Sequence, residues 1–353
     1  MKSKLINFEY FPAIESNTYE RIIADIATAA SEGYTSIIGL LLADGFLYKH
    51  NAVWNELHNQ IVLYANNLGI TVTLVSGMSH KNDVNCKTIP FDFYLHTVWN
   101  SYKDKHLKSY NPNTGKFLFL GGVPDRPNRI GLLYTLYNEG LLTNADWSFF
   151  PPWTLEQKEN SLKYFPSTKD YYDFIHFAER KVDNLYDSSK TYGTELIPKA
   201  TAWTNDSAWI DPEIYSSTSL SLISEGHPGD DNNNSEFLTE KIFRVFVQGH
   251  PFLLAANPII FNYIKELGFK TFEDYFPITD YATDVSEELR LKKLVENLKY
   301  FVSNGIDCIQ DIEYNKEHFY KLAKENARIL DTLDATKEEI DFYFNRKGFG
   351  HLL

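Results

Sequence analysis

The sequence lacks the marks of secreted, membrane-spanning and zinc-finger proteins. Its two cysteines, Cys86 and Cys308, are far apart and form no Cys-x-x-Cys pair, so neither a disulfide framework nor a cysteine zinc site is indicated. The longest aliphatic run, residues 37–43, is far below the roughly 20 residues that span a bilayer. The chain reaches Glu9 before any apolar signal-peptide core forms. We therefore expect a cytoplasmic protein with no transmembrane segment.

Positive charge is also scarce. The 34 lysines and arginines face 47 aspartates and glutamates, which gives a net charge of −13. A surface this acidic repels phosphate backbones at long range, so general binding to nucleic acid is not expected. This net charge still allows a basic pocket for a small phosphate ligand. The electrostatic field in a pocket is set mainly by charged groups within about 8 Å of it. The 28 asparagines, and 26 lysines against 8 arginines, are typical of AT-rich coding, as in some microbes and viruses.

Several catalytic motifs are absent as well. The sequence contains no P-loop, no Gly-x-Gly-x-x-Gly, no Gly-x-Ser-x-Gly and no His-Glu-x-x-His. It also contains no Asp-x-Asp, a pair of hard oxygen ligands that holds a divalent cation on phosphate oxygens. The adjacent Asp230 and Asp231 lie in an Asn-rich loop, where acids are usually just solvated. The sequence therefore gives no metal ligands.

Short apolar runs alternate with amphipathic stretches, which is typical of βα units around parallel sheets. The length of 353 residues fits one large α/β unit or two lobes. The pattern predicts strands at 34–43, 70–75, 91–96, 116–122, 214–224 and 251–256, helices at 53–67, 128–139, 171–186, 236–248, 284–301 and 315–345, and an aromatic loop at 144–168.

A turn-rich segment, residues 109–116, divides this pattern. We therefore predict an N-terminal α/β lobe over 1–112, a second α/β lobe over 113–310 and a helical tail over 311–353.

The most informative stretch is residues 223–254, which reads as a strand ending near Glu225, a polar loop, a helix, Gly249 and a strand. Apolar residues of this helix share one face, and Lys241 and Arg244 occupy another. The N-terminus of a helix favours an anion, so phosphate is the ligand expected there. The competing interpretation is a solvated face, on which Glu240 and Arg244 form a surface pair worth about 0.3–0.5 kcal/mol.

The same stretch resembles the α-1,3-fucosyltransferase family of nucleotide-sugar glycosyltransferases. The resemblance rests on Leu-Thr-Glu-Lys-Ile-Phe-Arg at 238–244 followed by Gly-His-Pro-Phe at 249–252, and more weakly on residues 116–140. Glu225-Gly-His stands where the family has Glu-Asn-Ser, which leaves the base and the sugar open. The family implies a GT-B type fold of two Rossmann-like lobes with parallel sheets.

The resemblance also implies a donor site. It assigns Glu240 to the ribose and Lys241 to the diphosphate of a nucleoside-diphosphate sugar, with GDP favoured as the nucleotide. Glu225 and Arg244 are expected among the donor-binding residues as well. Arg129, or its competitor Arg126, would also reach the diphosphate. In such a site arginine and lysine stabilise the leaving group without a metal, so no further cofactor is required.

Direct inversion at the anomeric carbon also needs a general base on the first lobe. Asp44 follows the carboxyl end of a predicted strand, where ligand crevices open in parallel α/β sheets. Glu9 and Glu15 compete with it. His80 and His96 also follow predicted strands, but lone histidines at such places are more often packed or solvated than catalytic.

The sequence thus predicts an inverting, metal-independent glycosyltransferase that moves a sugar, with fucose favoured, to a glycan hydroxyl. One alternative is a related transferase for another sugar or acceptor, such as a modified nucleobase. The other is a non-catalytic carbohydrate-binding or scaffold protein, to which the 15% aromatic content is suited.

Overall fold

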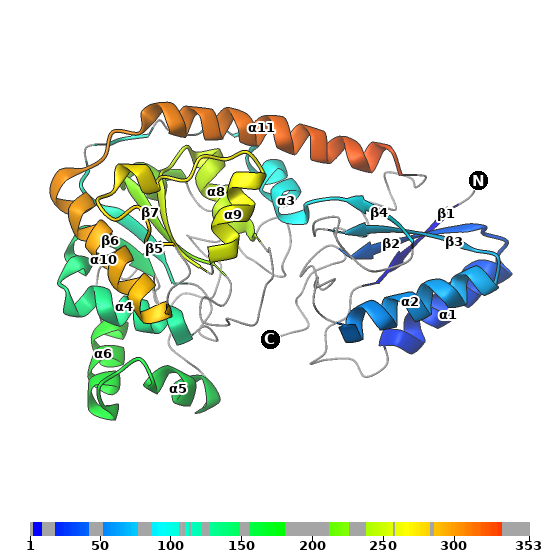
Figure 1. Ribbon diagram of the computed structural model, residues 1–353, viewed down its shortest axis with the longest axis horizontal. Coiled ribbons are helices and arrows are strands. Elements are labelled where there is room, and N and C mark those ends of the chain that lie inside the picture. Colours follow the sequence, from blue (N-terminus) through cyan, green and yellow to red (C-terminus); the bar gives the residue numbers. More distant parts are fainter. Residues whose placement is uncertain are drawn as a thin grey trace.

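The computed structural model describes residues 3–8, 18–41, 52–76, 86–105, 107, 110–112, 114–121, 127–148, 155–180, 212–225, 238–256, 258–282 and 286–333. Within these ranges the chain forms two four-stranded sheets whose strands are all parallel (Figure 1). Helices connect and cover both sheets. The predicted mixed α/β class with two parallel sheets is therefore confirmed at this level.

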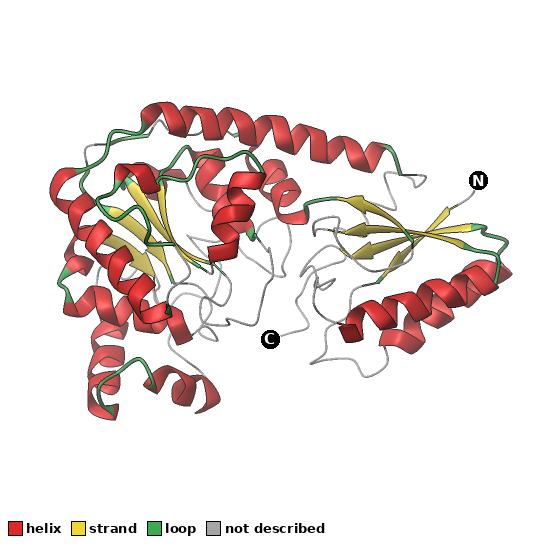
Figure 2. Cartoon of the chain, in the orientation of Figure 1, coloured by secondary structure: helices red, strands yellow, loops and turns green. Residues whose placement is uncertain are grey.

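The first sheet has its strands in chain order. It contains β1 (Ser3–Asn7), β2 (Ser36–Leu41), β3 (Thr71–Ser76) and β4 (Lys87–Pro90). The connections include α1 (Thr18–Ser31) and α2 (Ala52–Asn67). Each right-handed crossover steps in the same direction, which places both helices on one face of the sheet. Figure 2 shows α1 and α2 together on that side.

Packing in the first sheet is tight under these two helices. A Cβ atom on Gly39 of β2 would lie 2.8 Å from Leu74 and 2.9 Å from Phe8, so only glycine fits there without rearrangement. On the opposite face Ile38 and Leu40 join the hydrophobic core that also contains the second sheet. The first sheet is therefore covered by its own helices on one side and joined to the rest of the molecule on the other.

The second sheet has the order β6-β5-β7-β8. Its strands are β5 (Phe117–Leu120), β6 (Ala145–Ser148), β7 (Leu220–Ser224) and β8 (Phe252–Ala255). The step from β5 to β6, through α4 (Pro127–Asn138), runs opposite to the step from β7 to β8, through α8 (Glu240–Gln248). The connections therefore change direction between β5 and β7. Such a switch point opens a ligand crevice at the carboxyl ends of the strands.

Helices from several parts of the chain surround the second sheet. Besides α4 and α8 they are α3 (Phe93–Tyr102), α5 (Leu155–Leu162), α6 (Thr168–Arg180), α7 (Pro212–Ser216), α9 (Pro258–Glu266), α10 (Glu287–Asn304) and α11 (Ile309–Asp331), with short 3₁₀ turns at Leu141–Asn144 and Glu273–Tyr275. Helices α3 and α11 pack against α8, and α10 packs against β8 (Figure 1). Because β4 leads directly into α3, the carboxyl ends of the first sheet face α3 and α8.

Three buried asparagines hold helices α10 and α11 to extended chain. The side-chain amide of each accepts a hydrogen bond from the backbone N–H and donates one to the C=O of a single residue. Asn297 binds Ile278 in this way, Asn315 binds Lys270 and Asn326 binds Asp92. The backbone polar groups of these segments are thereby satisfied away from any sheet.

Most predicted βα units are confirmed, and three predictions were wrong in whole or in part. The strand predicted at 214–224 begins only at Leu220, because residues up to Ser216 form the helix α7. Residues 91–96 are not a strand: the strand ends at Pro90, and the Asp92 carboxylate accepts a 2.8 Å hydrogen bond from the Leu95 N–H that starts α3. The segment 144–168 is not only a loop, because it contains β6 and α5. The strand was missed because its aromatic and polar residues hide the apolar alternation. Helices α1 and α9 were not predicted.

Helix α3 precedes the predicted lobe boundary at 112 and packs against α8 in the second lobe. The boundaries at 112 and 310 therefore stay predictions. Within the described ranges, none of the helices combines the length and the apolar composition that a membrane crossing needs.

Candidate functional site

Arg129 lies at the switch point of the second sheet. It stands in the first turn of α4, and its side chain is buried. Its Nη1 donates to the carbonyl oxygen of Gly121, just after β5, and its Nη2 donates to the carbonyl oxygen of Ser224 at the end of β7, each at 3.4 Å. Bonds to carbonyl oxygens orient the guanidinium without removing its charge. The carboxyl edge between β5 and β7 thus carries a fixed positive group.

Gly121 lets the chain turn closely at this edge. Its N–H donates to the backbone oxygen and the hydroxyl of Ser148, at 3.2 and 3.1 Å. A Cβ atom on Gly121 would lie 2.5 Å from that backbone oxygen. The turn that presents a carbonyl oxygen to Arg129 therefore requires glycine.

Glu225 follows β7 directly and binds the start of α8. Its carboxylate accepts from the backbone N–H of Thr239 at 3.1 Å and from the Thr239 hydroxyl at 2.7 Å. Glu225 is 1% exposed. Thr239 is the N-cap of α8, because its hydroxyl accepts from the Lys241 N–H at 3.3 Å. The strand end and the helix start are thereby held together at the edge of the sheet.

Lys241 and Glu240 complete this cluster. The Lys241 ammonium donates to the Thr239 hydroxyl at 3.0 Å and to the Glu240 carboxylate at 3.1 Å. Arg244 lies one turn further on, 3.6 Å from the same carboxylate. Burial alone would raise the pKa of Glu240, but the charges of Lys241 and Arg244 outweigh it and hold the pKa at about 2. Glu240 is therefore ionised at neutral pH.

The competing interpretation of this helix, a solvated face with ordinary surface ion pairs, was wrong. Arg244 is 6% exposed and Gln248 is 4% exposed, because α3 and α11 cover the side of α8 that faces away from the sheet. Burial would lower the pKa of Arg244, but Tyr215 and Glu240 raise it above its ordinary value. The polar face of α8 is thus an interior surface, and its ion pairs are not ordinary surface pairs.

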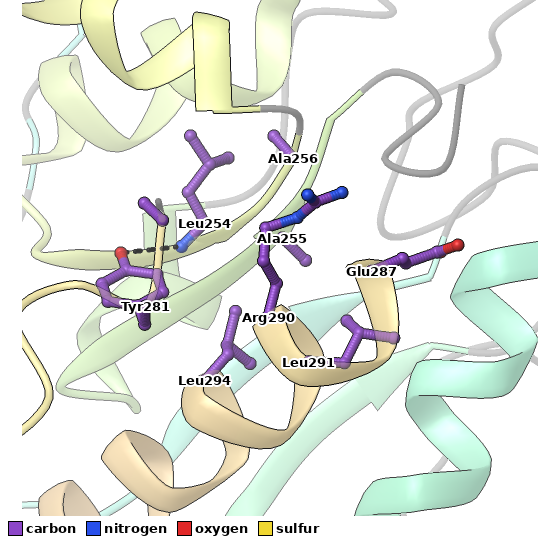
Figure 3. A pocket seen from close by; sticks show the side chains of 9 residues that line it. Leu254, Ala255, Ala256, Tyr281, Glu287, Arg290, Leu291 and Leu294 are labelled. Carbon is purple, nitrogen blue, oxygen red and sulfur yellow. Dashed lines mark hydrogen bonds between the residues drawn. The ribbon is translucent and has the colours of Figure 1, made fainter. Parts of the chain in front are cut away.

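A small pocket opens beside this cluster, at the carboxyl end of β8. Its walls come from β8 and α10, and it has about 260 Å³ of empty space when the part open to solvent is counted. The residues lining it are Leu254, Ala255, Ala256, Tyr281, Ala282, Glu287, Arg290, Leu291 and Leu294. Figure 3 shows the Arg290 side chain reaching past Ala255 toward Ala256, and the Glu287 carboxyl group pointing away from it. Arg290 is 6% exposed.

Arg290 was not among the predicted site residues. A signal for it was present: Arg290 stands one turn before Leu294 and two before Leu298, on the apolar stripe of its helix. A basic residue on an apolar stripe is expected to face the protein interior, where its charge needs a polar partner or ligand. From the sequence we predicted a helix over 284–301 and assigned no role to its residues.

The predicted general bases are not placed by the structure. Asp44, Glu9 and Glu15 lie outside the described residues, as do Arg126, His80 and the pair Asp230 and Asp231. The strands that precede Glu9 and Asp44 in the chain, β1 and β2, are adjacent and parallel, so their carboxyl ends share one edge of the first sheet.

His96 is described and lies on α3. Its Nε2 is 2.8 Å from the Asn100 side-chain amide, and its ring contacts Phe91 and Trp99. It is therefore a packed histidine, as the simpler interpretation expected.

Comparison with known proteins does not assign a function to this site. No protein-family model matches the chain, and no curated protein matches it significantly. Among the described residues, no three histidine, cysteine, aspartate or glutamate side chains gather as metal ligands would. The requirement for a metal is therefore still a matter of prediction.

Proposed function

We propose that the protein is an inverting, metal-independent glycosyltransferase that uses a nucleoside-diphosphate sugar, with GDP-fucose favoured and a glycan hydroxyl as acceptor. The proposed two-lobed fold is of the GT-B type. The proposal joins the family resemblance at residues 238–252 to the arrangement of charges at the carboxyl edge of the second sheet.

The observation that carries the proposal is the linkage of two cations at one edge. Arg129 binds the carbonyl oxygen of Ser224, Glu225 comes next in the chain, and Glu225 binds Thr239, which binds Lys241. Arg129 and Lys241 each stand in the first turn of a helix, where the macrodipole disfavours a cation and favours an anion. An arrangement that collects positive charge there is suited to a diphosphate.

The proposed chemistry divides between the two sheets. As the bond from sugar to diphosphate breaks, negative charge grows on the leaving phosphate oxygens, and Arg129 and Lys241 stabilise it electrostatically. The acceptor hydroxyl needs a base on the opposite side of the sugar, and Asp44, or in its place Glu9, is the proposed residue. With Glu240 on the ribose, the donor site would be assembled from α4, β7 and α8.

Turnover of the donor tests this proposal. The purified protein is incubated with GDP-fucose and a pool of glycans, with and without EDTA, and release of GDP is followed by chromatography. We expect release that is unchanged by EDTA. Asp44→Asn should slow release while leaving GDP binding intact, whereas Asp104→Asn is the matched control on a surface acid. Release that stops with EDTA and returns with Mn²⁺ would contradict the metal-independent mechanism.

A further inference from the structure

Arg290 brings a second buried guanidinium to the edge where Arg129 lies. Ala255, which lines the pocket with Arg290, pairs with Ser224, whose carbonyl oxygen binds Arg129. The N–H of Glu225 also donates to the carbonyl oxygen of Ala255 at 3.2 Å. The Arg129 guanidinium, carried by α4, is thus bound to the end of β7. Arg290, carried by α10, lines the pocket at the end of the neighbouring strand β8.

A tyrosine ties together the helices that carry these arginines. The ring of Tyr164 lies on Gly131 of α4, where a Cβ atom would come within 2.5 Å of the ring. The Tyr164 hydroxyl donates to the Glu287 carboxylate of α10 at 3.5 Å. This contact joins α4 to α10 through Glu287, the acidic side chain among the described residues that line the pocket. The helices that carry the two arginines are therefore linked through Tyr164.

The pocket has the size and the lining for one charged group. Its space of about 260 Å³ lies below the roughly 300–1,000 Å³ of pockets that hold a whole drug-sized ligand, so it suits one small group. Leu291, Leu294, Ala255 and Ala256 make most of its described wall apolar. Apolar walls strengthen an ionic contact because they lower the local dielectric. The planar guanidinium group of an arginine in such a wall can donate two parallel hydrogen bonds to two oxygens of one phosphate.

We infer that Arg290 binds the second phosphate of the nucleoside diphosphate, and that it sets the preference of the site for diphosphates over monophosphates. This inference rests on the proposed function. Arg129 and Lys241 then hold the phosphate nearer the switch point, and Arg290 reaches the other phosphate from β8. A nucleoside monophosphate makes the first set of contacts and leaves Arg290 without its ligand.

Calorimetric titration of the full chain with GDP, GMP and inorganic pyrophosphate tests this assignment. Arg290→Gln should weaken GDP and pyrophosphate about 10- to 100-fold, the effect of losing one charge-assisted hydrogen-bonded contact, and should change GMP affinity less than about threefold. Arg290→Lys keeps the charge but loses the fork, so it should weaken GDP by a smaller factor. If Arg290→Gln does not fold, the affinity of Arg290→Lys for GDP provides the test.

Lys292→Gln is the matched control, because Lys292 is exposed on the same helix and its removal changes the net charge equally. Equal GDP affinity in the parent and both Arg290 variants overturns the inference and leaves the proposed function standing. An equal loss for GDP and GMP overturns the second-phosphate assignment. If the parent binds pyrophosphate through Arg290 but no nucleotide, the anion site stands and the proposed function is wrong. If the parent binds none of the three, both are wrong.

Discussion

Glu225 and Thr239 form the contact that holds strand β7 to helix α8. Thr239 offers Glu225 both its backbone N–H and its hydroxyl, and the hydroxyl in turn accepts from the Lys241 ammonium. Lysine has only donors, so the Thr239 proton must point to Glu225. The residue expected to contact the ligand at this strand end is thus also a structural partner of the N-cap.

Removing either member of this pair should expose their coupling. Thr239→Val takes a donor from a carboxylate that is 1% exposed, so the free energy of unfolding should fall by about 1–3 kcal/mol. Glu225→Gln should destabilise as well, and the double variant should lose less than the sum of the two. Urea unfolding of the three variants measures this, with Thr143→Val as the exposed-threonine control. Strictly additive losses would show that the two side chains act separately.

Lys241→Ala should lower the turnover of the donor. A cation that contacts the departing diphosphate contributes about 2–4 kcal/mol in the transition state, or roughly 30- to 1,000-fold in rate. The ion pair with Glu240 is partly buried, so the variant should also lose about 1 kcal/mol of stability, more than a surface lysine would. Turnover is compared with that of Lys265→Ala, a lysine exposed on α9. Equal rates in both variants would remove Lys241 from the site.

The asparagine that binds Lys270 should be costly to replace. Asn315→Leu leaves both the N–H and the C=O of Lys270 without their side-chain partners in a partly buried place, which should reduce the free energy of unfolding by about 1–3 kcal/mol. The exposed Asn304 on α10 is the control, and Asn304→Ala should change stability by less than about 0.5 kcal/mol. Similar small losses at both positions would mean that the paired contact contributes little.

His250 should make stability depend on pH. Burial lowers its pKa to about 4 from 6.5, and its Nε2–H donates to the Thr218 carbonyl oxygen while Nδ1 accepts from the Ser221 hydroxyl. Between these two pH values the unfolded chain binds a proton that the folded chain does not bind. The free energy of unfolding therefore falls as the pH falls from 6.5 to 4, by a total on the order of 3 kcal/mol from this group.

Chemical unfolding at several pH values checks this effect. His250→Gln should have a flatter profile between pH 6.5 and 4 than the parent, whatever its absolute stability. The exposed His176 is the control, and His176→Gln should follow the parent. Parallel profiles for the parent and His250→Gln would contradict a buried neutral histidine.

The sequence predicted secondary structure correctly where the apolar residues followed a single helical or strand periodicity. Strands β2, β3 and β5 and helices α2 and α4 follow plain apolar patterns, and the left-handed Gly140 ends α4 as expected. The same reasoning misassigned the start of α3, because the capping role of Asp92 overrides an apolar run that resembles a strand.

Tertiary packing decided the rest. Periodicity separates the faces of α8 but does not show that α3 and α11 cover its polar face. The sequence therefore could not decide between a solvated face and the buried one on which Arg244 lies. Arg290 and Arg129 approach neighbouring strand ends only because β8 lies next to β7, a pairing between strands that the local sequence does not encode.

The most direct test of the account is titration of the parent protein and of Arg129→Gln with GDP, alongside UDP, CDP and ADP. Arg328→Gln, on an exposed position of α11, is the matched control. The account predicts that GDP binds the parent most tightly, that Arg129→Gln weakens it about 10- to 100-fold, and that Arg328→Gln leaves it unchanged. No binding of any nucleoside diphosphate at millimolar concentration, or equal GDP affinity in all three proteins, would contradict a diphosphate site at the carboxyl edge of the second sheet.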